Sequence, residues 1–229
     1  MATQTQARKK EPARPEKRSD EFVVVASERG LGYNLPQKMG RALWGPMFLM
    51  GLMAFVVALI LGIVNANDVA TAPGDQVTIE QLRHVTAGVM FIGFMSVFSA
   101  ITFAIARILG EFRKGGGEVQ ELLGGHVQTL KMPATAKGMI LFMMMGMMIL
   151  VVAVILHFVA AGTVVGASDA ALLSSERWFV ALEGVRRIGV AMHLFGIVLG
   201  LATIVHVLRF QSVRVRELAD EHARRRQDG

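Results

Sequence analysis

Residues 138–161 read GMILFMMMGMMILVVAVILHFVAA, and this stretch decides the fold class. It contains no charged residue, and its one ionisable side chain near neutral pH is His157. At about 1.5 Å per residue, a helix of this length crosses a hydrocarbon core of about 30 Å. A helix also lets a lipid-facing backbone satisfy its own hydrogen bonds. The stretch therefore predicts a transmembrane helix.

Three further apolar runs of similar length accompany it, at about 44–65, 85–109 and 188–208. The four runs predict an all-α integral membrane protein, a bundle of four transmembrane helices within residues 37–210. The preceding residues, 1–36, form a basic, charged tail whose composition is typical of disorder. No helix breaker follows the fourth run, so residues 211–229 are expected to continue it as a cytoplasmic helical extension.

The distribution of the basic residues predicts the topology. The chain has 24 Lys and Arg against 18 Asp and Glu, a net charge of +6. Most of these cations lie in 1–43, 110–137 and 209–229, while the two other connections together hold only Arg83, Arg177, Arg186 and Arg187. By the positive-inside rule both termini are cytoplasmic. The basic excess thus reflects topology and contact with membrane lipid, and no nucleic-acid partner is expected.

Several function classes are disfavoured by what the chain contains. It has no cysteine, which excludes disulfides, thiolate metal sites and iron–sulfur ligation within the chain. The centres of the four runs carry no Asp, Glu, Lys or Arg, which argues against a coupled transporter. Met139, Met143 and Met147 repeat at helical spacing, so MMMGMM at 143–148 indicates a packing stripe more than a copper path.

Four histidines within the apolar runs are the candidate site residues. His84, His157 and His193 are expected near the outer ends of the second, third and fourth spans, and His206 near the inner end of the fourth. Ionisable groups in a membrane usually have a partner, and haem b is one, because two imidazoles fill the axial positions of its iron. Polar packing of each histidine is the plainer alternative. A three-histidine metal site completed by Glu80 or Glu183 is another.

Three stretches carry a resemblance to a known family. LRHVTAG at 82–88, ATAKGMILFMMMGMMILVVAVI at 134–155 and RIGVAMH at 187–193 are similar to segments of the cytochrome b (gamma) membrane subunits of respiratory formate dehydrogenases and related hydrogenases. The resemblance implies an outer haem b between His84 and His193, with His157 as an alternative ligand. It matches His206 to one ligand of an inner haem. No histidine stands near Leu43, where the family has the other ligand, so His206 is expected to be a remnant.

The resemblance also implies a function. Such a subunit is a membrane anchor in the bacterial-type cytoplasmic (inner) membrane, which passes electrons from a partner enzyme of the respiratory chain toward quinone. Here the missing inner ligand makes quinone reduction doubtful. The alternative is a haem-free structural or accessory subunit of a multi-protein membrane complex. In either case the chain is expected to be a non-catalytic subunit. Arg83, Arg186 and Arg187 are expected either to pair with haem propionates or to anchor the interface with solvated heads.

Overall fold

The structure, a computed structural model, describes residues 22–26, 32–72, 74–124, 126–166 and 168–227. Over these residues it contains four helices, each long and apolar enough to cross a membrane, and two short strands. The helices are α1 (Leu35–Thr71), α2 (Gln76–Leu122), α3 (Ala134–Thr163) and α4 (Asp169–Gln227), and the strands are β1 (Val24–Ala26) and β2 (Gln128–Leu130). Most of the basic tail predicted at 1–36 lies outside the described residues.

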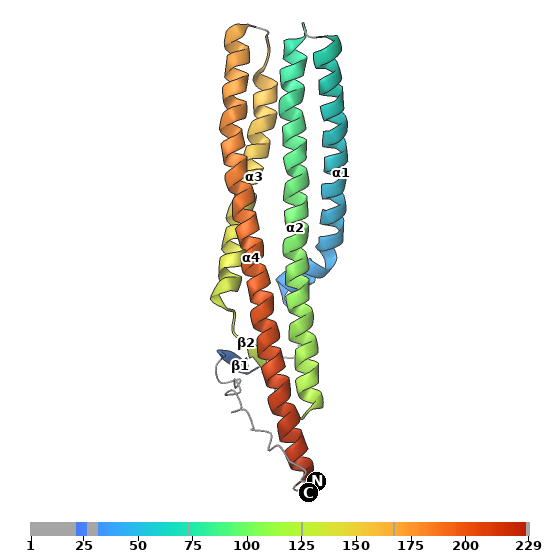
Figure 1. The fold of residues 1–229 in the computed structure, drawn as a ribbon, viewed down its shortest axis with the longest axis vertical. Coiled ribbons are helices and arrows are strands. Elements are labelled where there is room, and N and C mark those ends of the chain that lie inside the picture. Colours follow the sequence, from blue (N-terminus) through green and yellow to red (C-terminus); the bar gives the residue numbers. More distant parts are fainter. Residues whose placement is uncertain (1–21, 27–31, 73, 125, 167, 228–229) are drawn as a thin grey trace, which may run out of the picture.

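The helices form two antiparallel hairpins in an elongated bundle (Figure 1). The connections 72–75 and 164–168 lie together at one end of the bundle, called here the loop end. The start of α1 and the end of α4 lie toward the opposite end, called here the terminal end. Helices α2, α3 and α4 pack against one another, whereas α1 packs on α2 and makes no extended contact with α3 or α4. The core therefore consists of three helices with a fourth attached to one side.

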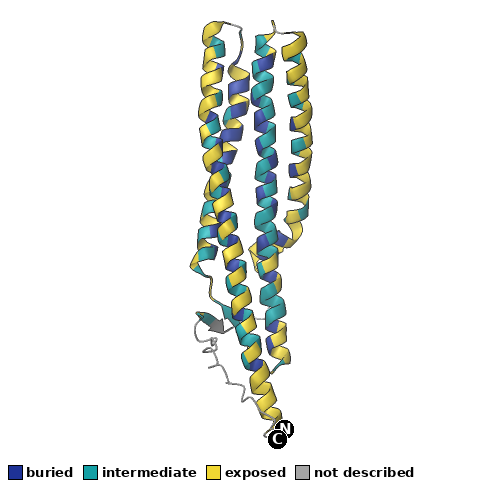
Figure 2. Ribbon diagram, viewed as in Figure 1, coloured by how far each residue is buried: buried dark blue, intermediate teal, exposed yellow. Residues whose placement is uncertain are grey.

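The buried residues of α3 and α4 repeat mostly at intervals of three, four or seven, whereas α2, which contacts all three other helices, is buried over a wider face. In α3 and α4 this period keeps one stripe of each helix facing its neighbours and favours a left-handed bundle of nearly parallel helices. Outside the stripe the residues of α3 and α4 are mostly exposed, as Figure 2 shows along their outer faces, and many of these exposed residues are apolar. In α4 the stripe is made of Ser175, Leu182, Arg186, Gly189, His193, Gly196, Gly200, Thr203 and Phe210.

Small residues bring α1 close to α2. A Cβ atom at Gly40 would lie 2.6 Å from the carbonyl oxygen of Phe103, and one at Gly51 would lie 3.0 Å from that of Gly93. Lipid tails are as apolar as the helices, so close van der Waals packing of this kind holds membrane helices together. The first turns of α1 lie at an angle to the rest, next to Pro46, which removes a backbone hydrogen bond (Figure 1).

Helix α2 runs further than its sequence suggests. The glycines Gly115, Gly116 and Gly117 indicate a loop after the second apolar run, yet the helix continues through them to Leu122. A Cβ atom at Gly116 would overlap the side-chain amide of Gln211 on α4, so the glycine lets the two helices approach. Beyond the helix, β2 pairs antiparallel with β1, and the Gln120 side chain hydrogen-bonds both the N–H and the C=O of Gln128.

Helix α4 begins at Asp169, well before the fourth apolar run at 188–208, and continues past that run to Gln227. Its first turns pack beside the ends of α2 and α3 at the loop end (Figure 1). The residues 169–187 are therefore helix, not a long connection between spans. This difference moves every residue of α4 along the bundle axis relative to its expected level, His193 included.

Candidate functional site

A buried polar cluster lies near the loop end, where α2, α3 and α4 meet. His84 of α2 and His157 of α3 are both fully buried, and their Nδ1 atoms are 3.1 Å apart. On its other side, His84 Nε2 lies 3.1 Å from the hydroxyl of Ser175 on α4. That hydroxyl donates to Glu80 Oε2 at 2.9 Å. The cluster thus links four side chains from three helices in one hydrogen-bonded chain.

The chain of contacts fixes which atoms carry protons when both imidazoles are neutral. Ser175 has one hydroxyl hydrogen, and it is donated to the Glu80 carboxylate, so the hydroxyl oxygen accepts from His84 Nε2. His84 Nδ1 is then an acceptor, and it accepts from His157 Nδ1. His157 Nε2 is then a hydrogen-bond acceptor at the end of this chain of contacts, and no donor of the protein contacts it. Such a chain is capable of passing a proton between Glu80 and His157.

Aromatic and cationic side chains enclose this cluster. The Phe179 ring lies 5.5 Å from the His84 ring and 5.8 Å from the His157 ring, measured between centroids. The Arg83 guanidinium lies 4.1 Å from the same ring, and that of Arg186 lies 5.2 Å from it. Both distances are typical of cation–π contacts. Phe179 therefore contacts both imidazoles and both guanidiniums.

Arg186 is not a solvated anchor. Only 3% of its side chain is exposed, and it forms an ion pair with Glu183 and lies 4.6 Å from the Phe91 ring. Arg187, its neighbour, pairs with the same carboxylate but is 78% exposed, as expected for an interfacial residue. The Arg186 Nε atom and His157 Nε2 are both buried without a hydrogen-bond partner. The first of these atoms is a hydrogen-bond donor, and the second is an acceptor when the imidazole is neutral.

His193 lies at another level of the bundle. Its ring stacks on Phe98 of α2 at 5.0 Å and 18°, its Nδ1 is 3.2 Å from the Gly189 carbonyl oxygen, and it fills the notch at Gly146 on α3. Phe98 is 14 residues from His84 along α2, which is about 21 Å at 1.5 Å per residue. The structure therefore brings His84 together with His157 and does not bring it together with His193.

These positions do not fit a haem. Its iron sits between two axial nitrogens, which must be about 4 Å apart because metal–imidazole bonds are about 2 Å long. His84 and His193 lie too far apart along the axis to serve as that pair. The Nδ1 atoms of His84 and His157 are too close to admit an iron, and both ring nitrogens of His84 already contact protein groups. A separate finding concerns the three-histidine metal site completed by Glu80 or Glu183: the described residues contain no group of three side chains placed to hold a metal ion.

His206 belongs to neither site. It is half-buried on α4, with its ring 5.5 Å from that of Phe22, which precedes β1. Its separation of 13 residues from His193 takes it off the seven-residue period of the buried stripe. The family resemblance matches His206 to one ligand of an inner haem. Among the described residues near the start of α1, no histidine is present to act as the second ligand.

Comparisons with protein-family models, with curated proteins and with solved structures found no match to this chain. The functional argument therefore depends on the chain's own residues. Among those, Ser175 and Phe179 are site residues that the apolar runs do not indicate, because both precede the fourth run. The signal that identifies Ser175 is its spacing: it lies seven residues before Leu182 and eighteen before His193, on the same stripe of α4.

Proposed function

We propose that this chain is a multi-pass protein of a bacterial-type cytoplasmic membrane, with both termini in the cytoplasm, and that it acts as a haem-free accessory subunit of a membrane complex. The proposed orientation is supported by the cations at the terminal end. They come from all four helices and from the connection before α3: Lys38, Arg41, Arg107, Arg113, Lys114, Lys131, Lys137, Arg209, Arg214 and Arg216. Such an excess is typical of the cytoplasmic side.

One observation carries the haem-free function. The buried histidines occupy positions of the packing stripes, and each is surrounded by protein at its own level. His157 follows Leu150 by seven residues, and His193 precedes Gly200 by seven. Buried polar side chains at such positions fix the register of helices against one another. The histidines therefore serve the assembly of the bundle, in the way that polar core residues do in coiled coils.

The end of α4 supports the role as a subunit. Leu218 is the last buried residue of the helix, and residues 219–227 are exposed on every side. An isolated helical segment this short is marginal in water, so tertiary or partner contacts normally stabilise it. Its last turn carries Arg224, Arg225 and Arg226. This projecting segment suits an acidic surface on a partner subunit.

The test separates this function from electron transfer through a haem. The full chain is purified in a mild detergent from membranes of the organism that makes it, and haem is measured by pyridine-haemochrome absorption. We expect no haem above background. We also expect the chain to migrate in native gels as part of a particle larger than a monomer or dimer. Removal of residues 219–227 is expected to release it from that particle without loss of helicity.

Two results would contradict the proposal. About one haem per chain, lost in both His84→Ala and His193→Ala, would establish the electron-transfer function that the family resemblance implies and would require a rearranged bundle. A chain that migrates alone from fresh membranes, with or without residues 219–227, would remove the subunit role. His206→Ala is the matched control for the histidine variants, because this histidine lies outside both buried sites.

A further inference from the structure

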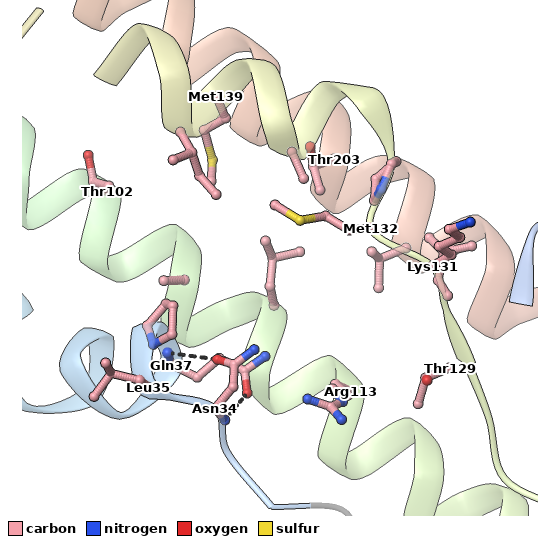
Figure 3. A pocket seen from close by; sticks show the side chains of 18 of the residues that line it. Asn34, Leu35, Gln37, Thr102, Arg113, Thr129, Lys131, Met132, Met139 and Thr203 are labelled. Carbon is pink, nitrogen blue, oxygen red and sulfur yellow. Dashed lines mark hydrogen bonds between the residues drawn. The ribbon is translucent and has the colours of Figure 1, made fainter. Parts of the chain in front are cut away.

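A cavity of about 580 Å³ lies between the two hairpins toward the terminal end (Figure 3). Its wall is made by the first turns of α1, the middle of α2, the connection from β2 to α3, the first turns of α3, and α4. This volume is within the range of small-molecule sites, about 300 to 1,000 Å³. The buried polar cluster at the loop end does not contribute to it, and the cavity is a separate candidate site.

The two ends of the cavity differ in chemistry. Phe103, Met139 and Ile140 line the end that points into the bundle. Arg113 and Lys131 line the other end, and Arg113 is 10 residues beyond Phe103 on α2, which is about 15 Å. Arg107 lies on α2 between Phe103 and Arg113. Its guanidinium lies 5.8 Å from the centre of the Trp44 ring of α1. Tryptophan and arginine are typical of the membrane interface. The cavity therefore extends from the apolar interior to the charged surface.

The polar side chains toward the deep end of the cavity already have hydrogen-bond partners within the protein. Its threonines are already bonded within the protein: Thr102 donates to the Phe98 carbonyl oxygen at 2.9 Å, and Thr203 donates to that of Leu199 at 2.8 Å. Gln37 is engaged with Asn34 in the cap of α1 (Figure 3). With these groups satisfied, an apolar chain is the occupant that suits the deep end.

The outer end of the cavity, in contrast, carries the positive charges of Arg113 and Lys131. Neither Arg113 nor Lys131 forms an ion pair with an acidic side chain in the part of the chain that the structure describes, and the two come from different sides of the cavity (Figure 3). Gln211 Oε1, at the same end, is buried without a partner. Two cations and an amide at the mouth of an apolar cavity suit a phosphate with a hydroxylated headgroup.

We propose that the cavity binds one phospholipid with an anionic headgroup, of the leaflet at the terminal end. One acyl chain lies against Phe103 and Met139, and the phosphate lies between Arg113 and Lys131. The proposal is independent of the accessory role argued above, since a haem protein could hold such a lipid equally well. It assigns a ligand class to the cavity: amphiphiles with a net negative head.

The experiment uses the full chain in neutral detergent and native mass spectrometry. Dioleoyl phosphatidylglycerol, dioleoyl phosphatidylcholine and free glycerol phosphate are each titrated, and the apparent Kd is compared. We expect phosphatidylglycerol to bind best and glycerol phosphate not to be retained. Each cation near an anionic lipid contributes about fivefold in affinity, so Arg113→Gln with Lys131→Gln should weaken phosphatidylglycerol about 25-fold. Lys38→Gln with Arg209→Gln removes two exposed cations outside the cavity and should change it less than twofold.

Filling the cavity provides a second variant. Val207→Trp on α4, or Met132→Trp on the connection before α3, places an indole in the cavity and should abolish retention of the lipid. Circular dichroism and a single gel-filtration peak establish that each variant is folded. Glycerol phosphate binding as tightly as the lipid would overturn the proposal in favour of a free-anion site. Equal retention of phosphatidylcholine and phosphatidylglycerol, or retention that both tryptophan variants leave unchanged, would overturn it as well.

Discussion

Replacing Gly40 with valine is expected to destabilise the protein by about 3 kcal/mol and to loosen α1 from α2. A Cβ atom at this position would lie 2.6 Å from the Phe103 carbonyl oxygen and 2.9 Å from the Arg107 backbone nitrogen. Both are backbone atoms of a packed helix, so neither can rotate away. Overpacking of a filled core costs about 1 to 3 kcal/mol, and a collision with backbone lies at the upper end of that range.

The measurement is the free energy of unfolding in mixed micelles, followed by circular dichroism during titration with a denaturing detergent. Because the chain has no cysteine, the contact between α1 and α2 can also be followed by crosslinking Trp44→Cys to Arg107→Cys. We expect the crosslink to form in the wild-type background and to be lost with Gly40→Val.

Gly62→Val is the matched control. It lies on the same helix, and a Cβ atom there would meet only Thr86 Cγ2, at an ordinary van der Waals distance of 3.8 Å. We expect this variant to be at least as stable as the wild type, because valine restricts the unfolded chain more than glycine does. Equal destabilisation by the two valines would show that helix propensity, and not the close approach of α1 to α2, governs this position.

Glu183→Gln is expected to destabilise the bundle by about 2 to 3 kcal/mol. It leaves the guanidinium of Arg186, 3% exposed, without its carboxylate. Breaking a fully buried pair costs about 3 to 5 kcal/mol, and the 38% exposure of Glu183 lowers that value through solvent screening. Arg187→Gln removes the other cation on the same carboxylate. Because Arg187 is largely exposed, we expect this change to cost less than about 1 kcal/mol.

A double variant isolates the cause. Arg186→Met with Glu183→Gln removes the buried charge together with its partner and places an unbranched apolar side chain beside Phe91 and Phe179. Replacing a buried ion pair with apolar groups is often neutral or stabilising, so the double variant should regain most of the stability lost in Glu183→Gln. The prediction fails if the double variant is less stable than Glu183→Gln, or if Arg187→Gln is as destabilising as Glu183→Gln.

The apolar runs were sufficient to predict four helices that could cross a membrane, because span length and composition are read directly from sequence. They were not sufficient to place α4 along the bundle axis. Arg186 and Glu183 interrupt the apolar pattern before the fourth run, so the hydropathy of the sequence predicts a span that begins at 188. In the fold these two residues are paired, and the helix continues beside α2 and α3 to Asp169.

This displacement explains why the two histidines of the family resemblance are separated. A histidine six residues into an apolar run is expected near its outer end. His193 instead stacks on Phe98, near the middle of the second run. The sequence does indicate the packed face of α4 by another pattern. The small and polar residues of this helix follow the seven-residue period of its buried stripe. In a membrane helix such residues indicate the packed face better than the apolar ones do.

The pairing of β1 with β2 and the passage of α2 through three glycines were beyond the sequence patterns. Both depend on contacts between distant segments: Val24 with Leu130 in the strands, and Gly116 with Gln211 between the helices. Glycine is unfavourable in an isolated helix by about 1 kcal/mol, and a neighbour that packs against it can offset this cost. No local pattern reports that neighbour.

The two connections at the loop end, residues 72–75 and 164–168, have a consequence for biosynthesis. Inserted with both termini in the cytoplasm, each hairpin would carry only a short connection and the charged first turns of α2 and α4 across the bilayer. Little polar chain is then translocated, so each hairpin can enter the membrane as a closed unit. A protease added from the far side would meet almost no cleavable backbone. Nearly all of the protein that water-soluble molecules can reach would lie in the cytoplasm.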